Sequence, residues 1–282
     1  MAKSKKSQSG QILLITLLVL SFVAIVVLSL ISRTTTSQKI TTQIDHYAKA
    51  LSAAEAGLEL ALQSHQSQSG TTETGVNFSV SGPIPIGTNN AIYALPETTP
   101  KGELAVVWLA RHNLDGSLNE NPAADYEGSY LDACWEKGKN PRVAVVATLL
   151  YKKAGNFLVA KSPYDSDNAS RDNSFSFDTG GVRNCGDSGN FEGQRLIFST
   201  LVSGYNAASD TLIALRLRPI YNSSRFRVQT EEPFRLVSQG DQYIATGLAV
   251  LATSVVEAGQ LYPAPGAIFD YVIYSQSGNF AQ

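Results

Sequence analysis

The sequence predicts an α+β protein, in which a long N-terminal helix precedes a mainly antiparallel β domain. Residues 12–31 carry no charge, residues 11–56 contain no glycine or proline, and the later chain alternates apolar runs with turn-forming clusters. We expect a basic leader at 1–10, the helix at 11–63, an irregular connection at 64–100 and a β-rich domain at 101–282.

The first half of the expected helix is apolar enough to cross a membrane. Residues 12–31 would span about 30 Å as a helix, which is the thickness of the hydrocarbon core of a bilayer. The run is too long for the apolar part of a secretory signal, and no A-x-A site follows it. Because three lysines precede the run, we expect a single-pass protein of the cytoplasmic membrane with its N-terminus inside and its later domain outside.

The second half of the expected helix is amphipathic. Its apolar residues recur at steps of four and three, which predicts one apolar stripe. These residues are Ile40, Ile44, Tyr47, Leu51, Ala54, Leu58 and Leu62. The Ser/Thr-rich residues 32–38 should continue the helix, because extending a helix is easier than nucleating one. An unbroken helix of this kind suits a protein whose apolar half packs against copies of itself.

A short basic leader ends in glycine directly before the apolar run, as Lys5-Lys6-Ser7-Gln8-Ser9-Gly10 followed by Gln11-Ile12-Leu13-Leu14-Ile15. Residues 53–57 read "AAEAG". Together these features resemble the type IV pilins and the pseudopilins of type II secretion. The resemblance implies a pilin-like fold, cleavage after Gly10 by a prepilin peptidase and a methylated N-terminus at Gln11. It also implies assembly with other pilin subunits on an assembly platform that a separate ATPase powers.

One residue departs from the family pattern. Most pilins have a glutamate five residues after the cut, where this chain has Ile15. Family members that lack the glutamate are minor subunits, including the pseudopilin at the filament tip. We therefore expect a minor subunit of a type IV pilus, or of a related secretion or DNA-uptake filament, that reaches the cell surface. The alternative is a membrane-anchored adhesin or binding module that does not polymerise.

Two cysteines follow the apolar run, Cys134 and Cys185. Export of this part of the chain would permit a disulfide between them, which would stabilise the fold by roughly 4 kcal/mol in the chain-entropy model. The alternative is a pair of reduced, half-buried thiols.

Charge and motifs argue against several function classes. The net charge is −2, and residues 64–282 alone carry −5, so we expect no direct binding of nucleic acid. The sequence contains neither a phosphate-binding G-x-x-x-x-G-K-[ST] loop nor a dinucleotide fingerprint. We therefore expect no cofactor and no enzymatic activity.

Two loops could be mistaken for catalytic or metal sites. Residues 186–189 read G-D-S-G, as around the serine of chymotrypsin-like proteases, but His112 is the only histidine after residue 65 and lacks the usual context. Asp165, Asp167 and Asp172 crowd another loop and are weak candidates for calcium ligands. A solvated turn is the simpler interpretation, and we expect no metal.

Runs of β-branched and aromatic residues predict the strands of the β domain. The segment Lys152-Lys153-Ala154-Gly155 predicts a hairpin turn. The C-terminal apolar run 268–274 is expected to be an internal strand, with pairing to a neighbouring subunit as the alternative. The expected strands are 104–110, 142–151, 156–161, 194–202, 211–218, 225–230, 233–238, 243–256 and 267–275.

Overall fold

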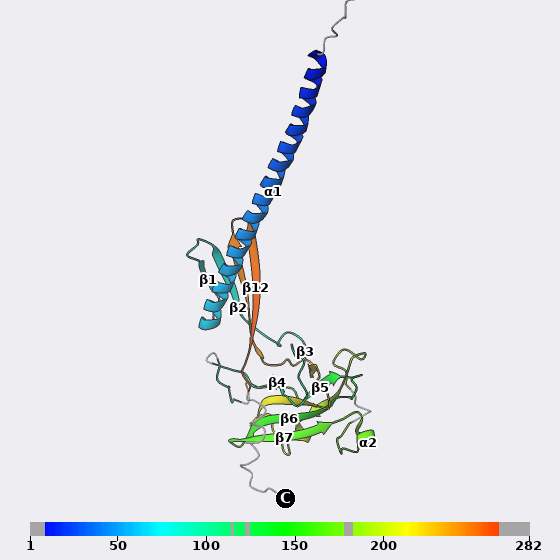
Figure 1. The fold of residues 1–282 in the computed structure, drawn as a ribbon. Helices are drawn as coiled ribbons and strands as arrows, with labels where there is room; N and C mark the ends of the chain where they lie inside the picture. Colours follow the sequence, from blue (N-terminus) through cyan, green and yellow to red (C-terminus); the bar gives the residue numbers. More distant parts are fainter. Residues whose placement is uncertain (1–8, 114–115, 122–124, 178–182, 265–282) are drawn as a thin grey trace, which may run out of the picture. The chain divides into compact units, whose positions relative to one another are not determined.

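The computed structural model describes residues 9–113, 116–121, 125–177 and 183–264, with side chains in the N-terminal helix from residue 12 onward. The chain forms two compact units, which are described separately. The first contains the N-terminal helix, the chain up to residue 82 and residues 243–258. The second contains residues 83–242 and the described residues from 259 onward. Figure 1 shows the elements of both units. The leader at 1–8 and the expected strand at 267–275 lie outside the described residues.

Helix α1 runs without a break from Ser9 to Ser64, close to the expected 11–63. Threonines in its middle donate their hydroxyl hydrogens to carbonyl oxygens one turn earlier, for example Thr34 to Leu30 at 2.9 Å and Thr41 to Ser37 at 3.0 Å. The hydroxyls therefore find partners inside the helix, and the Ser/Thr-rich stretch remains helical.

The sheet of the first unit covers the last turns of α1, from Ala50 onward. Its strand order is β1-β2-β11-β12, and β1 pairs antiparallel with β2. Alternate residues of β11, among them Tyr243 and Ala245, pack with Ala54, Leu58 and Ala61 of the helix. The bounds are β1 Gln68–Thr71, β2 Asn77–Pro85, β11 Gly240–Ala249 and β12 Ala252–Leu261.

Small residues allow the helix and this sheet to approach closely. Ala50 and Ala54 have no exposed surface, and a Cβ atom on Gly247 of β11 would lie 1.9 Å from the carbonyl oxygen of Ala50. A Cβ atom on Gly57 would lie 2.4 Å from the ring of Phe78. Ala53, Ala54 and Gly57 of the "AAEAG" run are therefore a packing surface, while Glu55 and Ala56 face solvent.

The second unit contains two antiparallel sheets that share one core. One has the order β3-β10-β5-β8 and the other the order β4-β9-β6-β7. Alternate residues of β6, such as Val145 and Leu149, meet alternate residues of β5, such as Leu131 and Trp135, in this core. The bounds are β3 Ile92–Ala94, β4 Ala105–Trp108, β5 Tyr130–Glu136, β6 Ala144–Lys153, β7 Asn156–Tyr164, β8 Phe191–Ile197, β9 Thr211–Ile220 and β10 Phe226–Thr230, with short helices α2 Asn168–Arg171 and α3 Phe198–Leu201.

The α+β class and several predicted elements are confirmed. Strands β6 and β7 pair from Val145↔Tyr164 to Lys153↔Asn156, and Ala154 and Gly155 of the predicted turn both have positive φ. This is the backbone geometry of a tight hairpin turn. The predicted strands at 104–110, 211–218 and 225–230 correspond to β4, β9 and β10.

The expectation of an irregular connection at 64–100 is wrong, because this stretch contains β1, β2 and β3. Its Gly, Pro and Asn residues disfavour strands, but Val76 and Val80 are buried against the helix and the sheet neighbours. Burial in the folded unit overrides the local preference here.

Three of the strand predictions are also wrong in detail. Residues 233–238 form no ladder, although Leu236 and Val237 are buried. The strand predicted at 194–202 ends at Ile197, after which α3 buries Phe198 completely. The single strand predicted at 243–256 is two strands joined by a turn at 250–251. Strand β5 was not predicted, because Asp132 and Cys134 interrupt its apolar residues.

Candidate membrane and assembly surface

In the first half of α1 the large apolar side chains are all exposed. The exposed fractions of its large apolar residues lie between 42% at Val26 and 70% at Leu20. Within the described residues, α1 is the one helix that is long and apolar enough to cross a membrane. Exposing so many large apolar side chains to water would be costly, at about 1.5–3 kcal/mol for each. This half of the helix therefore needs lipid or other protein around it.

Two of the three hydroxyl side chains inside the apolar half bond to their own helix. The hydroxyl of Thr16 donates to the carbonyl oxygens of Ile12 and Leu13, and the hydroxyl of Ser21 donates to that of Leu17 at 2.8 Å. A hydroxyl that is bonded to its own helix can enter a hydrocarbon phase without losing a hydrogen bond.

The structure places the predicted N-terminal site residues on this helix. Gly10 and Gln11 lie in its first turn, and the side chain of Ile15 is 57% exposed on its surface. The first acidic residue of the chain is Asp45, which forms an exposed ion pair with Lys49 at 2.7 Å. The hydrogen bond from Lys49 lowers the pKa of Asp45. The apolar half of α1 therefore offers no carboxylate to a neighbouring chain.

The predicted apolar stripe divides into two parts. Ala54 and Leu58 are buried against the sheet, whereas Ile40, Ile44 and Tyr47 are exposed by 51%, 63% and 53%. We call these three residues the upper stripe. The sheet of the same chain leaves the upper stripe uncovered.

A second apolar surface lies at the end of the β11–β12 hairpin. Val250 and Leu251 form its turn, with 88% and 63% of their surfaces exposed, and Leu248 and Val255 beside it are 53% and 57% exposed. We call these four residues the apolar tip. Hairpin turns are usually built from Gly, Asn or Asp, so a Val-Leu turn is unusual for a surface that faces water.

The structure joins Cys134 and Cys185 in a disulfide bond. Cys134 lies on β5 and Cys185 in the loop before β8, and both are fully buried beside Phe191. The bond fixes the Gly/Asn/Asp-rich loop to the sheet.

Arg171 engages two of the three aspartates named as weak calcium candidates, Asp165 and Asp167. The buried carboxylate of Asp165 accepts two hydrogen bonds from Arg171, at 3.0 and 3.1 Å, and one from Asn173 at 2.6 Å. The Asp167 carboxylate also lies 3.6 Å from Arg171. Nowhere in the described part of the chain do three acidic, histidine or cysteine side chains group as metal ligands would. The guanidinium group of Arg171 lies where a bound cation would have to lie.

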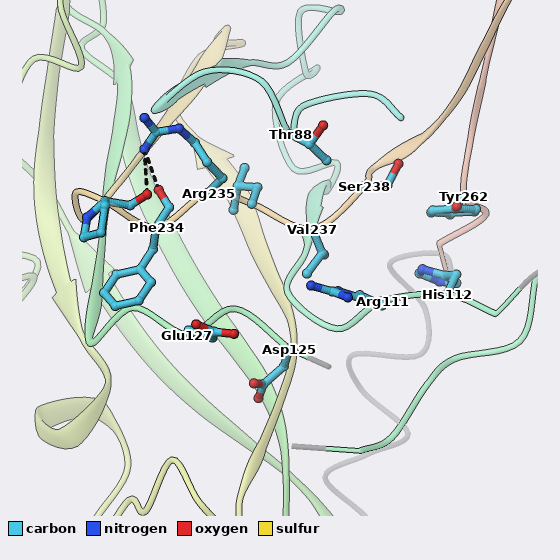
Figure 2. A pocket seen from close by; sticks show the side chains of 12 residues that line it. Thr88, Arg111, His112, Asp125, Glu127, Phe234, Arg235, Val237, Ser238 and Tyr262 are labelled. Carbon is cyan, nitrogen blue, oxygen red and sulfur yellow. Dashed lines mark hydrogen bonds between the residues drawn. The ribbon is translucent and has the colours of Figure 1, made fainter. Parts of the chain in front are cut away.

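A cavity of about 560 Å³ opens on the second unit, and sequence reasoning did not find it. Figure 2 shows the stacked rings of His112 and Tyr262 on one side of it and the carboxylates of Asp125 and Glu127 on the other, with Arg111 between them. The two rings lie 4.0 Å apart, and Trp108 packs edge-on against His112. The residues that line the cavity are far apart in the sequence, which is why no local motif predicted the cavity.

The charged groups of the cavity differ in their environments. Burial raises the pKa of Asp125 to about 7, and its carboxylate accepts a hydrogen bond from the backbone of Leu212 at 2.7 Å. Burial lowers the pKa of His112, whose Nδ1 atom has no hydrogen-bond partner among the described residues. Arg235 donates to the carbonyl oxygens of Pro233 and Phe234, as Figure 2 shows. Arg111 is exposed and forms no ion pair with any described residue. The cavity can therefore hold a polar ligand.

The histidine and the G-D-S-G loop do not form a catalytic triad among the described contacts. His112 stacks between aromatic rings, while Asp187 binds the side chain of Asn190 at 3.1 Å and lies 3.7 Å from Arg227. Asp187 thus serves to close its own turn, and the contacts of His112 are to aromatic rings.

Comparison with known proteins adds no relative. No protein-family model matches the chain, and neither the curated proteins nor the solved structures include a significant match.

Proposed function

We propose that this chain is a structural, pilin-like minor subunit of a type IV pilus or a related filament. The observation that carries the proposal is the division of α1, whose first half is apolar and exposed and whose last turns, from Ala50 onward, pack on the sheet of its own chain. A simple membrane anchor needs one span and then a tether. Here the span continues rigidly into the folded unit, so movement of the unit carries the span with it.

Such a helix is suited to two environments. In the membrane, lipid covers residues 12–31; in a filament, the same residues of neighbouring subunits cover one another. Removing these side chains from lipid into water would be prohibitive at about 1.5–3 kcal/mol for each large residue. Extraction is therefore favourable only where other helices replace the lipid, which is what assembly by helix packing provides.

The absence of a carboxylate at Ile15 favours a minor role. A glutamate there would pair with the N-terminal amine of a neighbour in the filament core, whereas an isoleucine offers only apolar contact. We propose an initiating or tip subunit, inserted with its N-terminus in the cytoplasm and later carried to the cell surface. Its partners would be other pilin subunits, the prepilin peptidase and the assembly platform.

Mass spectrometry of the protein from its native membrane tests the proposal. We expect a mature N-terminus at Gln11, with a methyl group on its amine. Replacing Gly10→Ala should leave an uncleaved precursor in the membrane and remove the protein from sheared filaments, while the control Gln8→Ala should be processed normally. An intact Met1 in the wild type, or normal incorporation of the Gly10→Ala variant, would refute the proposal.

The alternative is a membrane-anchored binding module that does not polymerise. The cavity beside His112 and Tyr262 favours it, because a concave surface with aromatic rings and unpaired charge is typical of ligand sites. Shearing separates the two functions: a filament subunit leaves the cells with the sheared material, whereas an anchored module stays in the membrane fraction.

A further inference from the structure

The apolar tip is built to meet another apolar surface. Residues 242–256 contain no charged side chain, and Val250 at the turn is 88% exposed. The tip is held firmly, because Gly247 lies against the backbone of Ala50 and Ala54, and Ala249 packs with Ala50 and Ala53. An exposed apolar turn on a rigid support marks an interaction surface rather than a loose loop.

The height of the tip above the membrane decides between lipid and protein. Ala50 lies 19 residues beyond Ile31, the end of the apolar span, which is about 28 Å along the helix. The hairpin runs back toward the membrane, since residue 243 packs near Leu58 and residue 249 near Ala50. The three strand residues from Gly247 to the turn lead back toward Ile31 by about 10 Å. Subtracting this from the height of Ala50 places the tip about 18 Å beyond Ile31 along the helix.

Lipid does not reach this height. The polar headgroup layer adds about 5–8 Å to each side of the hydrocarbon core, and a helix tilt of about 20° changes the height of the tip by only a few ångströms. The apolar tip therefore stands clear of the bilayer, and its partner must be protein.

The same chain carries an apolar surface at the matching height. The upper stripe, Ile40, Ile44 and Tyr47, lies 9 to 16 residues beyond Ile31, which corresponds to about 14–24 Å. Two copies inserted in one membrane have equal depth, so the tip of one copy and the stripe of the other lie at the same height. The charged neighbours Asp45 and Lys49 pair with each other beside the stripe.

We propose that the apolar tip of one copy docks on the upper stripe of a second copy in the same membrane. A two-fold axis along the membrane normal allows the contact to form twice. The contact continues the lateral packing of the apolar spans outward from the bilayer. The inference rests on the proposed function in one respect: it requires copies that meet side by side in a membrane.

Cysteine cross-linking between two differently tagged copies tests this contact. One copy carries Ile44→Cys and the other Val250→Cys, and both are expressed together as full-length chains. The two native cysteines bind each other, so the introduced thiols are the only free ones. We expect mild oxidation of the membranes to join the two tags, with a peptide linking positions 44 and 250 in the mass spectrum.

The matched control moves the helix thiol to the opposite face at nearly the same height. Thr42→Cys replaces Ile44→Cys, and cross-linking should fall at least about tenfold, because docking raises the effective concentration of position 250 only at the stripe. Adding Leu251→Asp to the Val250→Cys copy should reduce the 44–250 product similarly. Equal yields at positions 42 and 44, or a product that joins position 250 only to a different protein, would overturn the second-copy contact.

The assay also separates this inference from the proposed function. The Gly10→Ala variant should still give the 44–250 product, because the contact forms in the membrane before processing. A product in that variant together with an unprocessed wild-type N-terminus would retain the contact and reject the filament subunit. Normal processing of the wild type without any 44–250 product would retain the filament subunit and reject the contact.

Discussion

The close approach of β11 to α1 allows a quantitative test of the first unit. In Gly247→Ala the new Cβ atom would lie 1.9 Å from the carbonyl oxygen of Ala50 and 2.9 Å from the backbone nitrogen of Ala54. Neither atom can turn aside, because both belong to the helix backbone, so helix and strand must separate by about 1 Å. Overpacking of this kind typically costs about 1–3 kcal/mol.

Hydrogen exchange of the full-length protein in detergent measures this effect. A loss of about 1–3 kcal/mol should speed exchange of the amides in residues 50–62 and 243–256 by roughly 5- to 150-fold. Gly259→Ala on β12 is the control, since its Cβ would meet only the Cδ1 atom of Ile86 at 3.5 Å, an ordinary contact. Gly57→Ala should be intermediate, because the Phe78 side chain can move. Unchanged exchange in Gly247→Ala would refute the packing described here.

Three further predictions concern the second unit. Replacing Cys134 and Cys185 together by alanine should lower the free energy of unfolding by about 4 kcal/mol, measured by denaturant titration of tryptophan fluorescence; reduction of the wild type should match it. Burial raises the pKa of Asp125 from 3.8 to about 7, so the stability that its protonated form contributes is complete below its ordinary pKa and is lost as the pH rises through about 7. Unfolding free energy should thus fall with rising pH over this window in the wild type and less in Asp125→Asn; parallel pH profiles would contradict this. Arg171→Ala should cost about 3–5 kcal/mol by leaving the buried Asp165 carboxylate unpaired, Arg171→Lys should cost less, and equal melting temperatures would show that the ion pair is unimportant.

The sequence predicted α1 well because its signal is local. A long run without glycine, proline or charge leaves the backbone few alternatives, and the predicted bounds of 11–63 differ from the observed ones by only a few residues. The β6–β7 hairpin was predictable for the same reason, since Gly155 readily adopts the positive φ that a tight turn requires.

The other features described here, two strands, a turn and the cavity, depend on contacts between segments that are far apart in the sequence. Residues 68–85 have a composition typical of loops and become strands because they cover the helix together with β11. The turn at Val250 was hidden in an apolar run, since its residues do not favour turns in water. The cavity beside His112 joins residues from 88 to 262, which no spacing rule could bring together.

The strand order of the first unit has a consequence for the timing of folding. The sheet that covers α1 needs β2, which ends at Pro85, and β11, which begins at Gly240. Residues 86–239 must therefore be synthesised in between, which takes roughly 8 to 30 s at cellular rates of about 5–20 residues per second. During this interval the face of the helix around Ala54 is not yet covered by β11 and β12. A chaperone or the translocation machinery would have to shield that face until the C-terminal hairpin emerges.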